Sequence, residues 1–137
     1  MTRIDFYQLD SARYHPDKLV CSLCQKAFQS NQKVLLLTED QQQSDKFDRL
    51  LWTHDDESFL PHDQQEQDDF TTPVLVNHES SPRGERELLI NLSHEIPIYF
   101  AQFERVIELV TSDNKATSRE HYIFYRERGY ELNHHKI

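Results

Sequence analysis

The segment KVLLL at residues 33–37, followed by TEDQQQSDKFDRLLW at 38–52, decides the fold of this chain. Consecutive apolar residues in so short a run are typical of a strand that is covered on both faces. Thr38 is expected to cap a helix, because Gln41 three residues later completes a capping box. The helix is expected to end near Trp52, and its inward residues are Phe47, Leu50 and Leu51. A buried strand followed by an amphipathic helix is the repeating unit of parallel α/β sheets.

The rest of the chain continues this alternation. Further strands are expected at 3–9, 72–76, 88–92 and 105–110. Further helices are expected at 16–31, 97–104 and 114–128, with Gly129 as a left-handed cap after the last of them. The order predicts a three-layer α/β/α fold with a mostly parallel sheet, as one domain over residues 1–137.

Composition restricts the functions that this fold can serve. The chain has 137 residues and a formal charge of −9, which opposes non-specific binding to nucleic acid. No apolar run approaches the ~20 residues that cross a bilayer, and the N-terminus lacks the features of a signal peptide. A cytoplasmic protein without membrane contact is therefore expected.

Glycine and cysteine usage argues against cofactor chemistry. The only glycines are Gly84 and Gly129, so neither a dinucleotide fingerprint nor a phosphate-binding loop can be written. The fold is therefore expected to be Rossmann-like without a nucleotide site. Cys21 and Cys24 have no second pair and lie at helical spacing, which favours burial of that helix face over metal or redox chemistry. No metal, cofactor or catalytic residue is predicted, and the terminal pair His134-His135 is expected to be solvated.

A long acidic loop at 53–69 interrupts the alternation, and loops of this length in compact domains are often functional. It follows Trp52, the only tryptophan, and contains an apolar island of Phe59, Leu60 and Pro61. These four side chains either pack back onto the core or form a protein-binding patch, which acidic surroundings would keep soluble.

The closing helix carries a local excess of positive charge. Residues 115–137 contain five basic and three acidic side chains, whereas the other 114 residues have a net charge of −11. Arg119, Tyr122 and Arg126 share one helix face, with Ile123 beside them. With Val110 from the preceding strand, they form a candidate pocket for an apolar side chain next to a carboxylate. The alternative is a surface helix with Arg–Glu pairs, on which Phe124 and Tyr125 serve the core.

The order of these segments resembles the chi subunit family of bacterial DNA polymerase III. The matching stretches are DFYQLD (5–10), KVLLL with TED (33–40), LW with ESFLPH (51–52 and 57–62), INL (90–92) and REHYIFYRERGYELN (119–133). The resemblance covers nearly the whole length and includes the terminal pattern R-E-x-Y-x-x-Y-R-x-x-G-[YF]-x-L-N.

The resemblance implies a non-catalytic accessory of the clamp loader rather than an enzyme. It implies that the psi subunit binds at Trp52, Phe59, Leu60 and Pro61, a surface that an iron–sulfur helicase uses in some family members. It also implies that the acidic C-terminal tail of single-stranded-DNA-binding protein binds at Val110, Arg119, Tyr122, Ile123 and Arg126. Two features depart from the family pattern. Ile123 stands where a lysine is usual, with Lys115, Arg126 or Arg128 as substitutes, and the 110–119 segment is about two residues shorter.

Two other functions remain open at this point. One is a small nucleotide-dependent enzyme on a Rossmann-like fold, and the other is direct binding of single-stranded DNA by the Arg/Tyr helix. The missing phosphate loop argues against the first, and the −9 charge argues against the second.

Overall fold

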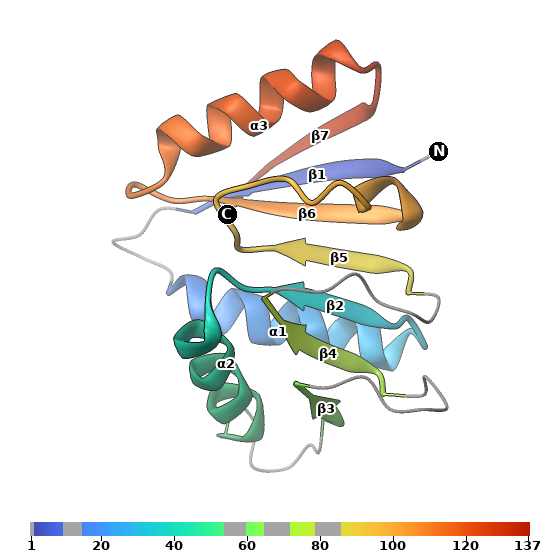
Figure 1. Cartoon of the computed structure of the whole chain (residues 1–137), viewed down its shortest axis with the longest axis vertical. Coiled ribbons are helices and arrows are strands. Elements are labelled where there is room, and N and C mark those ends of the chain that lie inside the picture. The colour runs from blue at the N-terminus through green and yellow to red at the C-terminus, as the bar shows by residue number, and fades with distance from the viewer. Residues whose placement is uncertain (1, 10–14, 54–59, 65–71, 79–85) are drawn as a thin grey trace.

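A computed structural model describes residues 2–9, 15–53, 60–64, 72–78 and 86–137 of the chain (Figure 1). Its centre is a seven-stranded sheet in the order β3-β4-β2-β5-β6-β1-β7, and every strand pair is parallel. The strands are β1 Arg3–Gln8, β2 Val34–Leu37, β3 His62–Asp63, β4 Val74–Asn77, β5 Leu88–Asn91, β6 Arg105–Val110 and β7 Glu131–Lys136. The helices are α1 Pro16–Gln29, α2 Gln41–Thr53, α3 Lys115–Glu127 and the 3-10 turn η1 Phe100–Gln102. The predicted fold class is confirmed.

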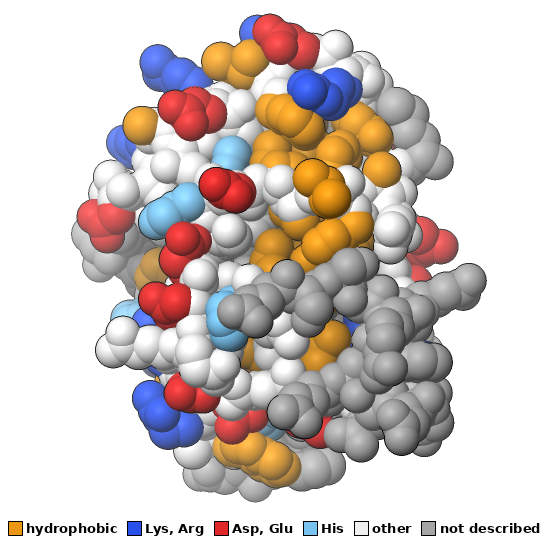
Figure 2. Space-filling view, viewed as in Figure 1, with side chains coloured by type: hydrophobic (Ala, Val, Ile, Leu, Met, Phe, Trp, Pro, Cys, Tyr) orange, Lys and Arg blue, Asp and Glu red, His pale blue; other side chains and the backbone are white. Residues whose placement is uncertain are grey.

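The sheet separates two apolar layers, because successive strand residues point to opposite faces. On one face, α1 and α2 cover alternate residues such as Leu36, Ile90 and Ile107. On the other face, α3 and η1 cover the intervening residues, among them Leu35 and Leu89 (Figure 1). On that second face, apolar side chains also reach the surface in a band over α3 and η1 (Figure 2).

The cysteine pair belongs to the first of these layers. Cys21 and Cys24 are buried in α1, and both thiols are free. Burial raises the pKa of Cys21 to about 11 and also raises that of Cys24. Both side chains therefore act as apolar packing groups at neutral pH.

The predicted start of α2 was wrong by two residues. Asp40, not Thr38, caps the helix, because its Oδ1 accepts from the backbone N–H of Gln43 at 2.8 Å. The side chain of Gln43 in turn accepts from the backbone N–H of Glu39 at 2.7 Å. Thr38 is instead buried and its hydroxyl bonds to Ser44 at 2.5 Å. Several polar residues follow one another here, so the capping pattern has more than one possible register.

Two strands and one helix boundary also differ from the predictions. β3 lies within the segment that was expected to be loop only, and β7 occupies a segment for which no strand was expected. His134 and His135 are both exposed, as expected, although His135 also stacks on Tyr7 with ring centroids 4.8 Å apart and lies 3.3 Å from Asp5. Both strands are polar and lie at sheet edges, where little apolar surface is buried. The helix expected at 97–104 is only the three-residue turn η1.

No helix in the described part of the chain is both long enough and apolar enough to cross a membrane.

Gly129 ends α3 in the predicted left-handed conformation, with φ +77°. Its N–H donates to the carbonyl of Arg126 at 3.0 Å, and the N–H of Tyr130 donates to that of Tyr125 at 3.2 Å. These two bonds define a Schellman motif. The same motif ends α1, where Asn31 takes the left-handed position with φ 59°.

The two motifs make a matched stability test. Gly129→Ala should lower the free energy of unfolding by about 1 kcal/mol, because only the backbone conformation is unfavourable and no atom lies within 4 Å of the added Cβ. Asn31→Gly should not lower it, since glycine accepts that conformation readily. Urea denaturation of both variants measures the difference, and an unchanged Gly129→Ala protein would contradict this account of the helix end.

Candidate functional site

One flank of α3 gathers the basic and aromatic residues that the sequence singled out. Lys115, Arg119, Tyr122 and Arg126 recur at spacings of four, three and four residues, which places them in one row along the helix. We call these four residues the α3 flank. The ring of Tyr122 packs edge-on against Phe6 of β1 at 5.5 Å, and the guanidinium of Arg126 lies 5.9 Å from the centre of the Tyr122 ring. The flank therefore faces the β1–β7 side of the sheet.

The cations of the α3 flank lack carboxylate partners in the described part of the chain. Within the described residues, Lys115, Arg119 and Arg126 form no ion pair, although the chain has 24 acidic side chains. The alternative prediction, a surface helix with Arg–Glu pairs, is therefore wrong for the described part of α3. Arg128, on another side of α3, lies 3.5 Å from the Phe124 ring centre and donates to the Phe124 carbonyl. Unpaired cations around an exposed aromatic ring are suited to binding an anionic peptide.

The other two predicted residues of this site lie at its margins. Val110 is half-buried at the end of β6, beneath the first turn of α3. Ile123 is exposed and follows Arg119 by four residues, so it lies directly beside the flank, on the side turned away from the sheet. Val110 therefore belongs with the α3 flank, whereas Ile123 extends the surface toward solvent.

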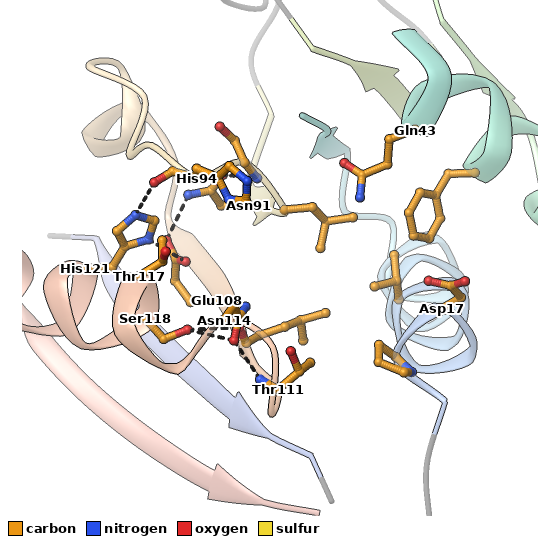
Figure 3. Close-up of a pocket in the computed structure, with 16 residues that line it drawn as sticks. Asp17, Gln43, Asn91, His94, Glu108, Thr111, Asn114, Thr117, Ser118 and His121 are labelled. Atoms are coloured by element: carbon orange, nitrogen blue, oxygen red, sulfur yellow. Dashed lines mark hydrogen bonds and ion pairs between the residues drawn. The ribbon is translucent and has the colours of Figure 1, made fainter. Parts of the chain in front are cut away.

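A buried carboxylate holds α3 on the sheet (Figure 3). Glu108 of β6 is 3% exposed, and its oxygens accept from three side chains. The donors are His121 Nδ1 at 3.0 Å, the Tyr125 hydroxyl at 2.8 Å and Asn91 Nδ2 at 2.9 Å. Sequence analysis missed this cluster, although a glutamate inside the apolar strand RVIELV was a signal for it.

The partners of His121 fix its protonation. Its Nδ1 meets the Glu108 carboxylate and its Nε2 meets the carbonyl oxygen of His94 at 2.8 Å, so both nitrogens must donate. Burial would lower the pKa of His121, but the hydrogen bond and charge of Glu108 outweigh burial, and the pKa lies above its usual value. The pKa of Tyr125 is also raised, first by burial and then by the charge of Glu108, which keeps its hydroxyl a donor.

A cavity of about 160 Å³ with polar and apolar walls lies beside this cluster, between α1, α2 and α3 (Figure 3). It opens at the carboxyl ends of β5 and β6, where parallel α/β folds commonly bind ligands. The volume is below the roughly 300 Å³ from which small-molecule sites begin, and Asp17 and Glu108 line it. Carboxylates at this position oppose a nucleotide phosphate. The nucleotide-dependent enzyme therefore gains no support from this cavity.

The second predicted surface begins at the end of α2. Trp52 is 53% exposed, and its ring lies 4.6 Å from that of His62. Leu60 is buried in the core, and Pro61 is half-buried. Phe59 lies outside the described residues. His62 fixes this segment against α2, with Nδ1 at 2.8 Å from the Leu60 carbonyl and Nε2 at 3.0 Å from the Asp48 carbonyl.

The fold and these surfaces define a parallel α/β domain whose exposed residues are suited to protein contacts. Comparison with known proteins then identifies its family. The family described as "DNA polymerase III chi subunit, HolC" matches residues 1–133. The chain is 36% identical over 140 residues to the DNA polymerase III subunit chi of Pseudomonas aeruginosa, with 100% of this chain and 98% of that protein covered. The chi subunits of Haemophilus influenzae and Escherichia coli are each 32% identical, with 85% of this chain covered and 83% and 82% of those proteins. The chain belongs to the DNA polymerase III chi subunit family, whose members are replication subunits.

The buried pair of Glu108 and His121 predicts how stability depends on pH. The folded-state pKa of His121 lies above the unfolded value of about 6.5, so the folded state binds more protons between these two values. The pair's contribution is therefore complete below pH 6.5 and is lost as pH rises through the folded pKa. His121→Gln should lose about 3 kcal/mol at pH 6 and should flatten this dependence.

Urea denaturation at a series of pH values between 5.5 and 9 measures both effects. His94→Gln is the control, because the His94 side chain is exposed and its carbonyl is retained. A His121→Gln protein whose stability changes with pH as steeply as the parent's would contradict the assignment.

Proposed function

We propose that this chain is a non-catalytic adaptor of the DNA polymerase III clamp loader. Its α3 flank binds the acidic C-terminal tail of single-stranded-DNA-binding protein, and its Trp52 surface binds the psi subunit. Neither cofactor, metal, membrane nor direct DNA contact is part of this function, and we expect it to be carried out in the cytoplasm. The observation that carries the proposal is the row of cations beside Tyr122, which form no ion pair with any residue that the structure describes, in a chain of net charge −9.

The chemistry of the α3 flank supports an acidic peptide as its ligand. Arg119 and Arg126 lie on either side of Tyr122, and each guanidinium can donate two parallel hydrogen bonds to a carboxylate. Tyr122 is 38% exposed and supplies apolar area at low entropic cost. Bulk nucleic acid is a poor ligand, because the acidic remainder of the surface would repel a long phosphate chain.

A peptide ending in Asp-Asp-Ile-Pro-Phe should therefore bind with micromolar affinity. The affinity should fall about tenfold or more from about 0.05 M to about 0.3 M salt, because screening weakens contacts with exposed charges. Arg119→Ala should abolish binding, whereas Arg49→Ala, which removes an exposed arginine from α2, should not change it.

Fluorescence anisotropy with a labelled peptide tests this prediction. Absence of binding, or equal affinities for the Arg119→Ala protein and its parent, would refute the tail site. A labelled single-stranded oligonucleotide, titrated with the protein in place of the peptide, should show no binding.

The Trp52 surface supports a second protein partner. Trp52 is exposed at the end of α2, and its ring packs against His62. His62 is itself hydrogen-bonded to two backbone carbonyls, so the exposed Trp52 ring rests on a side chain of fixed position. Exposed tryptophan on a rigid surface is typical of the residues that dominate binding energy at interfaces. The psi subunit is the proposed partner, and an iron–sulfur helicase is a possible second partner for the same surface.

Trp52→Ala should weaken binding to purified psi subunit at least 30-fold, the equivalent of about 2 kcal/mol. Ile98→Ala is the control, because it removes an apolar side chain that is 99% exposed on the opposite face of the sheet. Isothermal titration calorimetry gives both affinities. If Trp52→Ala binds psi as the parent does, the Trp52 surface is not the psi site. Binding of the acidic peptide should be the same for both variants.

A further inference from the structure

β7 leaves one edge of the sheet open beside α3. In the described part of the chain, β7 pairs only with β1 and ends the sheet on that side. It has six residues, whereas β3 at the opposite edge has two. α3 contacts β7 and lies along the same edge of the sheet (Figure 1). The open edge of β7 is therefore long enough to accept a further strand next to the α3 flank.

The hydrogen bonds of β7 show which of its backbone groups face outward. The N–H of Ile137 donates to the carbonyl of Gln8 in β1 at 3.0 Å. In a parallel pair, the N–H and C=O groups of one residue point to the same side, and successive residues alternate between sides. Leu132, His134 and Lys136 therefore direct their N–H and C=O groups away from β1, and no residue that the structure describes hydrogen-bonds to these groups.

These outward groups form a regular row of donors and acceptors. A row of this kind at a sheet edge is a template for pairing with another chain. When an extended peptide adds to such an edge, main-chain hydrogen bonds supply affinity and alternate side chains supply specificity. β7 therefore offers the backbone part of a peptide site, and the side chains around it decide which peptide fits.

The side chains beside this edge favour an acidic peptide. Leu132 is opposite Ile4 of β1 and His134 is opposite Phe6, so both point to the face that α3 covers. Tyr122 of the α3 flank packs against Phe6 on that face. Alternate side chains of a strand added beside β7 would point to the same face, toward the cations of the α3 flank. Carboxylates at those alternate positions would form charge-assisted hydrogen bonds with the guanidinium groups.

A second copy of the chain is the other occupant that an open edge could accept. Two chains of net charge −9 repel each other, whereas the cations of the α3 flank attract an acidic segment. The charges therefore favour an acidic peptide over a second copy.

We propose that the acidic peptide bound on the α3 flank adds a strand to β7. Its backbone pairs with the outward N–H and C=O groups of Leu132, His134 and Lys136, and its carboxylates at alternate positions bind Arg119 and Arg126. This inference rests on the proposed function, since it takes the acidic tail as the ligand. It assigns recognition of the peptide backbone to β7 and recognition of its charge to α3.

Peptides with N-methylated backbones test the pairing on the unaltered, full-length protein. The probe is the acetylated peptide Thr-Asp-Thr-Asp-Thr-Asp-Asp-Ile-Pro-Phe, made with N-methyl groups on its three Thr residues or on its first three Asp residues. One of the two methylated peptides should bind about tenfold or more weakly than the parent peptide, because its donors to β7 are lost. The other should bind within about twofold of the parent peptide, because its methyl groups point away from β7.

A proline variant tests the same pairing from the protein side. His134→Pro removes an outward N–H and breaks no bond to β1, and proline is tolerated at sheet edges for that reason. His134→Ala is the matched control, because it loses the same side chain and keeps the N–H. The proline variant should bind the probe at least about fivefold more weakly than the alanine variant does. Urea denaturation of both variants excludes loss of folding as the cause.

The possible failures can be told apart. If the probe does not bind the parent protein, the proposed function itself is wrong. If the probe binds and requires Arg119, but the two methylated peptides have equal affinities, the tail site stands and the pairing with β7 is refuted. Hydrogen exchange of the Leu132, His134 and Lys136 amides should slow at saturating probe. If these amides are already protected without peptide, more so at higher protein concentration, a second copy occupies the edge and the proposal is wrong.

Discussion

Glu108 imposes the constraint on which the rest of this structure depends. A carboxylate in the middle of a buried parallel strand is costly unless every oxygen is hydrogen-bonded. Three side chains donate hydrogen bonds to the Glu108 carboxylate. They are Asn91 from the neighbouring strand and His121 and Tyr125 from one face of α3. Since those donors are fixed in the helix, the carboxylate sets both the position and the rotation of α3 on the sheet.

The rotation of α3 decides which residues are available for binding. With His121 and Tyr125 turned inward, helical geometry places Tyr122 and Arg126 on the flank toward β7. The Schellman motif at Gly129 then reverses the chain and starts β7 beside β1, which adds Lys136 to the same face. One buried polar cluster thus positions a surface whose own residues make few contacts with the core.

The sequence predicted the elements whose signals are local. Apolar runs such as residues 34–37 indicate central strands, because a strand buried on both faces requires apolar residues. Gly129 indicates the helix end, because the left-handed backbone conformation there favours glycine. The edge strands β3 and β7 were missed because their residues are polar and their pairing depends on distant partners. The start of α2 was wrong because consecutive polar residues permit several caps.

For the candidate site, the sequence predicted the row of residues on α3. It did not predict the buried cluster around Glu108 that fixes this helix, or the strand β7 beside it. Glu108 and His121 are 13 residues apart on different elements, so their contact follows only from the fold. The cavity lined by Leu9, Val110 and Lys136 likewise depends on β7, since Lys136 joins it through pairing with β1. Trp52 and Leu60, grouped by sequence, have opposite environments, because one is exposed and the other is buried.

The central claim is that an acidic peptide binds along the α3 flank, on the side of the helix toward β7. The most direct measurement is a two-dimensional ¹H–¹⁵N correlation spectrum of the labelled protein during titration with the free-acid peptide. The account predicts saturable shift changes in the amides of α3, in those of β7, and in the residues at the ends of β1 and β6. Changes centred on α1 and α2, or none at saturating peptide, would contradict it.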